Sequence, residues 1–212
     1  MIIKQNNDTE AGLAKAMFLF DRIAQESHVA REGFITTHRE KVCSAAFMIH
    51  RSFQAGGKLL IFGNGGSAAD AQHMAAELTG RLLKERAPLP AIALTTDSSA
   101  LTAIGNDYGY DQVFLRQVQA LASPKDVIFA ISTSGNSKNV LSAVKAAKTL
   151  GCRVIALTGG TGGALDKLAD IGLCVSKGAN SCRIQETHIF AIHAIIDVLD
   201  SCCDSLEYRS LL

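Results

Sequence analysis

The sequence repeats one local pattern along most of its length: a short apolar segment, a loop of small polar residues, and then a helical pattern. Segments that are apolar on both faces and alternate with helices form a parallel sheet that is covered by helices on both sides. We therefore expect an α/β fold with a parallel five-stranded sheet flanked by helices. Ligands of such sheets bind at the carboxyl ends of the strands, where this sequence reads GNGGS, TTD, STSGNS and TGG. The apolar segments are residues 58–62, 91–94, 126–131, 153–157 and, more weakly, 171–175.

The N-terminal quarter of the chain lacks this pattern. Residues 10–55 are predicted to be helical, with two apolar sets that are joined by a mixed stretch containing Gly33. No apolar strand precedes them, so we expect a pair of helices added to the α/β domain. Such a pair would either cover a face of the sheet or pack against another subunit. The predicted division is a helical oligomerisation segment (1–55), the α/β domain (56–203) and a C-terminal tail (204–212).

The loop after the third apolar segment has the composition of a phosphate site. Ser132, Thr133, Ser134 and Ser137 supply neutral hydroxyl donors, and a helical pattern begins directly after them. The free N–H groups and the dipole of a helix N-terminus favour a bound anion, so this loop suits a phosphate monoester. The alternative is an ordinary capping turn, because Ser and Asn are the commonest N-cap residues.

The loop after the first apolar segment has a similar composition. Residues 63–68, GNGGSA, fit the G-x-G-x-x-A pattern of a dinucleotide site. That site also requires an acidic residue about 20 positions further on, and Asp97, at the end of the second strand, comes later than that. A small phosphorylated ligand that contacts both this loop and the STSGNS loop explains more of the sequence.

Three ionisable residues are candidates for acid–base chemistry. His73 and Glu77 are four residues apart on the helix after GNGGS, so they share one helix face; the alternative is a solvent-exposed pair. His193 lies in an apolar stretch of the last helix, where we expect burial and where a hydrogen-bonded core histidine is the alternative. A carboxylate and a histidine that meet beside a phosphate loop would suit proton transfer next to a sugar carbonyl.

Composition argues against several other classes of function. The net charge of +1 gives no reason to expect nucleic acid or an anionic membrane as a partner. Residues 1–10 lack the apolar core of a secretory signal, and no run approaches the ~20 apolar residues of a membrane span. We therefore expect a cytoplasmic protein. Its six cysteines are expected to be reduced, rather than bound to zinc or paired in disulfides.

Four segments together resemble the bacterial phosphoheptose isomerases, which isomerise sedoheptulose 7-phosphate and carry a sugar-isomerase (SIS) domain. The segments read GNGGSAADAQHMAAEL, PAIALTTDSSALTAIGNDYGY, ISTSGNSKNV and RIQETHIFAIH. The resemblance covers about residues 10–203, and the combination of H-x-x-x-E, R-I-Q-E and a later His is more specific than the STSGNS loop. It implies the flavodoxin-like three-layer sandwich of SIS domains. It also implies an enediol route to D-glycero-D-manno-heptopyranose 7-phosphate and a role in heptose biosynthesis for the lipopolysaccharide envelope.

The resemblance also implies roles for individual residues. Glu77 would be the catalytic base and His193 its acid/base partner. Some relatives hold one zinc ion per subunit, and the family forms homotetramers with active sites at subunit interfaces. The zinc ligands would be His73, Glu77, Gln185 and His193. Besides Glu77, the substrate contacts would be Asn64, Gly65, Gly66, Thr96, Asp97, Ser132, Thr133, Ser134, Ser137 and Gln185.

The spacing of two proposed zinc ligands limits how they can meet. Gln185 and His193 are eight residues apart, roughly 12 Å along a straight helix. To reach one ion, their side chains would have to lean together or come from different subunits.

Two related families offer alternative functions. The DnaA initiator-associating protein, a non-catalytic tetrameric SIS protein of replication control, is similar to residues 89–121. That family lacks the glutamate and the final histidine that are present here as Glu77 and His193. A phosphosugar-sensing regulator would bring a DNA-binding domain, and the N-terminal helices show no basic recognition helix. Cys182 stands where some phosphoheptose isomerases carry an acidic residue, a departure that concerns substrate contacts rather than the reaction.

Overall fold

A computed structural model describes residues 2–203 of the chain and the side chains of residues 10–202. Within that part, five strands form one parallel sheet in the order β2-β1-β3-β4-β5. This strand order is the flavodoxin-like one, so the predicted sheet is confirmed. The strands are β1 (Leu59–Phe62), β2 (Ala91–Ala93), β3 (Val127–Ser132), β4 (Arg153–Gly159) and β5 (Ile171–Val175).

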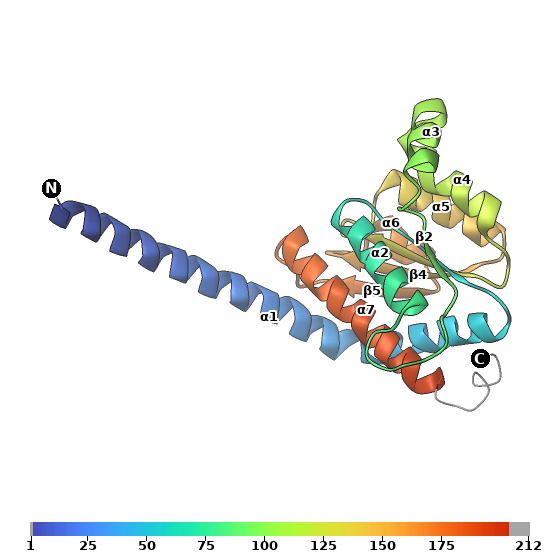
Figure 1. The fold of residues 1–212 in the computed structure, drawn as a ribbon, viewed down its shortest axis with the longest axis horizontal. Coiled ribbons are helices and arrows are strands. Elements are labelled where there is room, and N and C mark those ends of the chain that lie inside the picture. The colour runs from blue at the N-terminus through green and yellow to red at the C-terminus, as the bar shows by residue number, and fades with distance from the viewer. Residues whose placement is uncertain (1, 204–212) are drawn as a thin grey trace.

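Helices cover both faces of the sheet and complete a three-layer sandwich (Figure 1). Their bounds are α1 (Ile2–Gln54), α2 (Gly66–Thr79), α3 (Ser98–Tyr108), α4 (Val113–Leu121), α5 (Lys138–Thr149), α6 (Gly163–Leu168) and α7 (Ser181–Cys203), with a 3₁₀ turn, η1, at Tyr110–Gln112. α1, α2 and α7 pack on one face of the sheet, and α3, α4, α5 and α6 pack on the other.

The strands are apolar on both faces because alternate residues enter different cores. In β1, Leu59 and Ile61 belong to the core under α1, α2 and α7, whereas Leu60 and Phe62 belong to the opposite core. All four side chains are fully buried. This two-sided burial explains why the strands appear in the sequence as continuous apolar runs.

The N-terminal appendage is helical as predicted, but the predicted pair of helices is wrong: α1 is one continuous helix of 53 residues. Gly33 does not interrupt it, and the Thr37 hydroxyl donates to the Gly33 carbonyl oxygen at 2.8 Å within the helix. A Cβ at Gly33 would lie 2.7 Å from Cδ of Lys177. The glycine therefore lets the segment after β5 pack closely against α1 instead of breaking the helix.

The two halves of α1 have different surroundings. Its C-terminal half covers the sheet through buried residues such as Phe34, Ala45 and Ile49. Its N-terminal half extends away from the domain (Figure 1), and there Phe18 and Phe20 are 73% and 68% exposed. One half of the helix thus covers the sheet, and the other presents apolar side chains to solvent in a single chain.

Several element boundaries differ from the predicted ones. The sequence predicts a helix to about Lys84, but α2 ends at Thr79, before Gly80. Residues 105–109, GNDYG, have the composition of a turn, but α3 continues through them as far as Tyr108, and Gly109, with a φ of 86°, follows it. The predicted tail, 204–212, lies outside the described residues.

Candidate active site

The two loops with phosphate-binding composition lie side by side at the carboxyl edge of the sheet. β1 and β3 are neighbouring strands, with β2 beyond β1 and β4 beyond β3. The winding of the chain therefore reverses between them, and ligands of doubly wound sheets bind at such a switch point. The first loop leads into α2 at Gly66 and the second into α5 at Lys138, so two helix N-termini lie at this edge.

Serine hydroxyls of the STSGNS loop converge. Ser132 Oγ lies 3.0 Å from Ser137 Oγ and 3.5 Å from Ser134 Oγ, and the half-buried Thr133 lies between them in sequence. Ser137 is the N-cap residue of α5, but its side chain makes no capping hydrogen bond. Ser137 therefore does not cap α5 through its hydroxyl. Hydroxyls that converge at the start of a helix suit an anion, so phosphate binding here stays a prediction.

The shape of the STSGNS loop depends on Gly135. Its φ is 64°, in the left-handed region that residues with side chains rarely adopt, and a Cβ there would overlap the backbone of Gly162. The Leu165 N–H donates to the Gly135 carbonyl oxygen at 2.9 Å. The Gly-rich loop after β4 thus supports the STSGNS loop from behind.

Asn64 connects the first loop to the helix after the second. Asn64 Nδ2 donates to Asn139 Oδ1 at 2.9 Å, and Asn139 Nδ2 donates to Asn64 Oδ1 at 2.8 Å. The Tyr110 hydroxyl also donates to Asn64 Oδ1, at 3.3 Å. Gly65, which follows, has a φ of 57° and open space where a Cβ would lie. Sequence reasoning missed Asn139, which is 3% exposed, because its partner lies 75 residues away.

The other predicted substrate contacts lie around these loops. Gly66 lies against the carboxamide of Gln185 on α7, which a Cβ at Gly66 would overlap. Thr96 and Asp97 are exposed just after β2. Asp97 caps α3 by accepting a hydrogen bond from the Ala100 N–H at 2.9 Å. Their contacts with substrate stay predictions.

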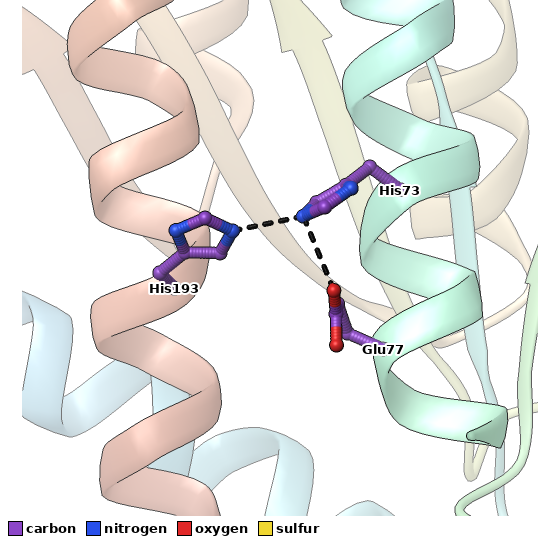
Figure 2. Close-up of side chains that lie close together, drawn as sticks. All are labelled: His73, Glu77 and His193. Carbon is purple, nitrogen blue, oxygen red and sulfur yellow. Dashed lines mark hydrogen bonds and ion pairs between the residues drawn. The ribbon is translucent and has the colours of Figure 1, made fainter. Parts of the chain in front are cut away.

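His73, Glu77 and His193 converge from two helices (Figure 2). His73 Nε2 lies 2.8 Å from His193 Nε2 and 3.5 Å from Glu77 Oε1. The 2.8 Å distance is that of a hydrogen bond, in which one ring nitrogen carries the hydrogen and the other accepts the hydrogen bond. All three side chains are half-buried, so the expected burial of His193 is wrong. The structure thus places a carboxylate and a histidine from two helices together.

The same three residues have the composition and spacing of a metal site. One ligand atom from each lies within 4.8 Å of the other two, and His and Glu are normal zinc ligands. Three protein ligands beside an open position are typical of catalytic zinc sites. The fourth proposed ligand, Gln185, contacts Gly66 at the start of α2. His193 contacts His73, which lies about 10 Å further along that helix.

Asp70 is another ionisable residue of this region that sequence reasoning missed. It precedes His73 by about one helical turn, and its Oδ2 is buried without a hydrogen-bond partner. Burial raises the pKa of its carboxyl group to about 6, while the charge of His73 opposes that shift. The i,i+3 spacing of Asp70 and His73, which places both on one helix face, is the signal in the sequence.

Comparison with known proteins gives a family model, a relative and two solved structures that resemble this chain. The family model of the SIS domain matches residues 24–159. A phosphoheptose isomerase from Aliarcobacter butzleri is 51% identical over 187 residues, which cover 88% of this chain and 97% of the relative. Two solved phosphoheptose isomerases are also similar. The one from Neisseria gonorrhoeae has a TM-score of 0.80 and 49% identity, covering 86% of this chain and 99% of that chain. The one from Francisella tularensis has a TM-score of 0.84 and 40% identity, covering 88% and 98%.

Proposed function

The chain belongs to the phosphoheptose isomerases of the SIS-domain family, and we propose that it converts sedoheptulose 7-phosphate to D-glycero-D-manno-heptopyranose 7-phosphate through an enediol. The names of the relatives give the class of enzyme. We infer the substrate, the product and the roles of individual residues from the geometry of the site.

The observation that carries the proposal is the convergence of Glu77 and His193. Interconversion of a ketose and an aldose requires one group to remove the proton next to the carbonyl and another to donate a proton to the carbonyl oxygen. Glu77 and His193 offer a carboxylate oxygen and a ring nitrogen within 4.8 Å of each other. Two groups at that separation suit adjacent atoms of one substrate.

The STSGNS loop would bind the phosphate group at the other end of the sugar. Its hydroxyls from Ser132, Ser134 and Ser137 converge, and Thr133 adds a fourth donor. α2 begins at Gly66, at the same edge of the sheet as this loop, and His73 lies about 10 Å further along the helix. Phosphate binding would therefore orient the reacting carbons towards Glu77.

In the proposed reaction, Glu77 removes a proton from C1 of the ketose while His193 donates a proton to the C2 oxygen, which gives the enediol. His193 then takes the proton of the C1 hydroxyl, and Glu77 returns its proton to C2, which gives the aldose. Contacts that orient the sugar hydroxyls would come from Asn64, Gly65, Gly66, Thr96, Asp97 and Gln185.

We propose that His73, Glu77 and His193 hold one zinc ion per subunit. Gln185 would be the fourth ligand, either by leaning along α7 or by coming from another subunit. A bound zinc ion would polarise the substrate carbonyl and stabilise negative charge on the enediol oxygens.

His73→Ala is expected to weaken zinc binding by at least about 100-fold, because it removes one of three convergent ligands. Gln185→Ala is expected to have a smaller effect, since Gln185 lies about two helical turns from His193. Calorimetric titration of zinc into metal-free protein measures both, and the exposed His28 supplies the control variant His28→Ala. Equal affinities for the wild type and His73→Ala would remove this cluster as the zinc site.

We further propose a homotetramer with active sites at subunit interfaces. The exposed apolar side chains on the N-terminal half of α1 support this assembly, since burial between subunits would remove them from water. They are Leu13, Met17, Phe18, Leu19, Phe20 and Ile23.

Within residues 2–203, no helix combines the length and the apolarity that crossing a bilayer requires. The proposed location is the cytoplasm, and the proposed role is heptose biosynthesis for the lipopolysaccharide envelope.

The proposed function is tested by incubating the zinc-loaded protein with sedoheptulose 7-phosphate in heavy water and following the products by NMR. A new aldoheptose phosphate with deuterium at C2 would support an enediol that exchanges protons with solvent. The same product without deuterium would point to a shielded proton shuttle or a hydride shift. If no new sugar phosphate forms with or without zinc, the proposed function is wrong, and binding to DnaA is the next measurement.

A further inference from the structure

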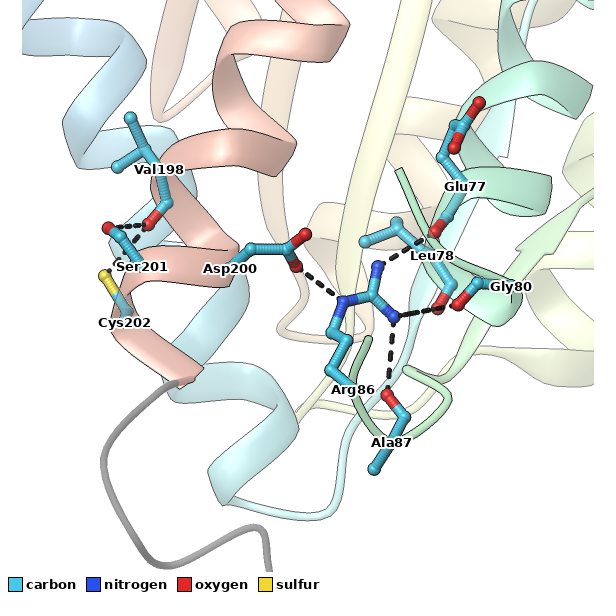
Figure 3. Close-up of polar contacts among 9 residues, drawn as sticks. All are labelled: Glu77, Leu78, Gly80, Arg86, Ala87, Val198, Asp200, Ser201 and Cys202. Atoms are coloured by element: carbon cyan, nitrogen blue, oxygen red, sulfur yellow. Dashed lines mark hydrogen bonds and ion pairs between the residues drawn. The ribbon is translucent and has the colours of Figure 1, made fainter. Parts of the chain in front are cut away.

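A buried ion pair fastens the C-terminal end of α2 to α7 (Figure 3). Arg86 lies in the segment between α2 and β2, and its Nε donates to Oδ1 of Asp200 on α7. The Arg86 side chain is 9% exposed and the Asp200 side chain 3%. Two charges this far from water are stable only when each has its partner.

The rest of the Arg86 guanidinium group caps α2. Nη2 donates to the carbonyl oxygen of Glu77 at 2.8 Å, and Nη1 donates to the carbonyl oxygens of Leu78 and Gly80 at 2.8 and 3.2 Å. The last carbonyl groups of a helix lack partners within the helix, and a cation there is also favoured by the helix dipole. One of the carbonyl groups that Arg86 holds belongs to the proposed catalytic base.

Asp200 lies on the same face of α7 as His193. The two residues are seven positions apart, which is about two helical turns. α2 and α7 are therefore joined at two levels, by the hydrogen bond between His73 and His193 and by the pair of Arg86 and Asp200. Buried side chains of both helices lie in one apolar core.

We propose that Arg86 and Asp200 are positioning residues, which hold the last turn of α2 against α7 and thereby set the separation of Glu77 and His193. The inference rests on the proposed catalytic roles of those two residues. The guanidinium fork suits this task because its donors have a fixed, planar arrangement. Asp200 suits it because its carboxylate is buried and pairs with the guanidinium group through Oδ1.

Two variants test the proposal. Asp200→Asn keeps the size of the side chain but removes its charge, and Arg86→Lys keeps the charge but replaces the fork with a single ammonium group. Each is expected to lower kcat about 10- to 100-fold, since small misplacements of reacting groups have effects of that size. KM for the sugar phosphate is expected to stay within about twofold, because the hydroxyl loop after β3 is not attached to this pair.

A second ion pair, whose carboxylate is buried and whose lysine side chain is 27% exposed, supplies the control. Lys58 Nζ lies 2.7 Å from Asp126 Oδ2, and the Asp126 side chain is 1% exposed. This pair joins the amino ends of β1 and β3, at the opposite edge of the sheet from the loops. Asp126→Asn is expected to lower the melting temperature as Asp200→Asn does, but to leave kcat unchanged.

Hydrogen exchange of the amides of residues 74–80 provides a measurement that does not depend on activity. Asp200→Asn and Arg86→Lys are expected to accelerate this exchange, and Asp126→Asn is not. The proposal is overturned if Asp200→Asn and Arg86→Lys lose no more kcat than Asp126→Asn at an equal loss of melting temperature. If the wild type does not isomerise the sugar phosphate, the proposed function fails separately. Unchanged hydrogen exchange of residues 74–80 in both Asp200→Asn and Arg86→Lys would then overturn the positioning role as well.

Discussion

Glu77→Gln is expected to lower kcat for sedoheptulose 7-phosphate by about 10³-fold or more, because glutamine keeps the size and polarity of the side chain but cannot accept the substrate proton. That loss corresponds to about 4 kcal/mol of transition-state stabilisation. KM is expected to change much less than kcat, since the phosphate loop is untouched. The measurement is steady-state kinetics, together with deuterium incorporation at C2 of the product. The rate of product formation and the rate of deuterium incorporation at C2 depend on the same proton transfer, so both rates should fall together.

The control for this variant is Glu32→Gln, which makes the same chemical change at a glutamate whose side chain is 68% exposed on α1. The melting temperature and the elution volume of Glu77→Gln should match those of the wild type. Arg86 binds the backbone carbonyl of Glu77 rather than its carboxylate, so the end of α2 keeps its cap. A wild-type rate in Glu77→Gln would show that another group is the base.

Local sequence patterns predicted the strands and the loops at their ends. A strand that is buried on both faces is a run of consecutive apolar residues, and a loop is a run of consecutive small residues, so both are visible in a short stretch of sequence. The segment 171–175 became β5 with the same bounds. Gly33 shows where local reasoning fails: a glycine in a helical pattern indicates a break, but here it makes room for Lys177, which is 144 residues away. Local pattern gives no sign of such a contact.

The same limit applies to the candidate site. The spacing of His73 and Glu77 identified one helix face, but the partner of His73 is His193, 120 residues away. Arg86 and Asp200 lie 114 residues apart, and each has the appearance of an ordinary surface charge in the sequence. The residues that do the proposed chemistry were therefore recognisable by type and spacing, whereas the residues that hold them in place required the packing of α2 against α7.

His188 is expected to make the protein less stable in mild acid. It is fully buried on α7, and its Nε2 donates to the Thr158 carbonyl oxygen at 3.0 Å while its Nδ1 has no partner. Burial lowers the pKa of its imidazole to about 4, below the ordinary value of 6.5. Between these values the unfolded chain binds the proton and the folded chain does not. Stability therefore falls as the pH falls, by about 2 kcal/mol between pH 7 and pH 4.5 from this residue alone.

His188→Gln isolates this contribution, because glutamine can still donate to the Thr158 carbonyl oxygen but does not titrate. The free energy of unfolding, measured with urea at pH 7 and pH 4.5 and at one protein concentration, should fall about 2 kcal/mol less for the variant than for the wild type. Asp70 acts in the opposite direction, since its raised pKa makes the folded chain bind a proton in the window from about 6 down to 3.8. Asp70 is present in both proteins, so its effect cancels in the difference.

The control is His28→Gln, at an exposed histidine, which should keep the wild-type pH dependence. An unchanged pH dependence in His188→Gln would mean that His188 takes up its proton in the folded protein, and the buried imidazole would then have to gain a partner for Nδ1.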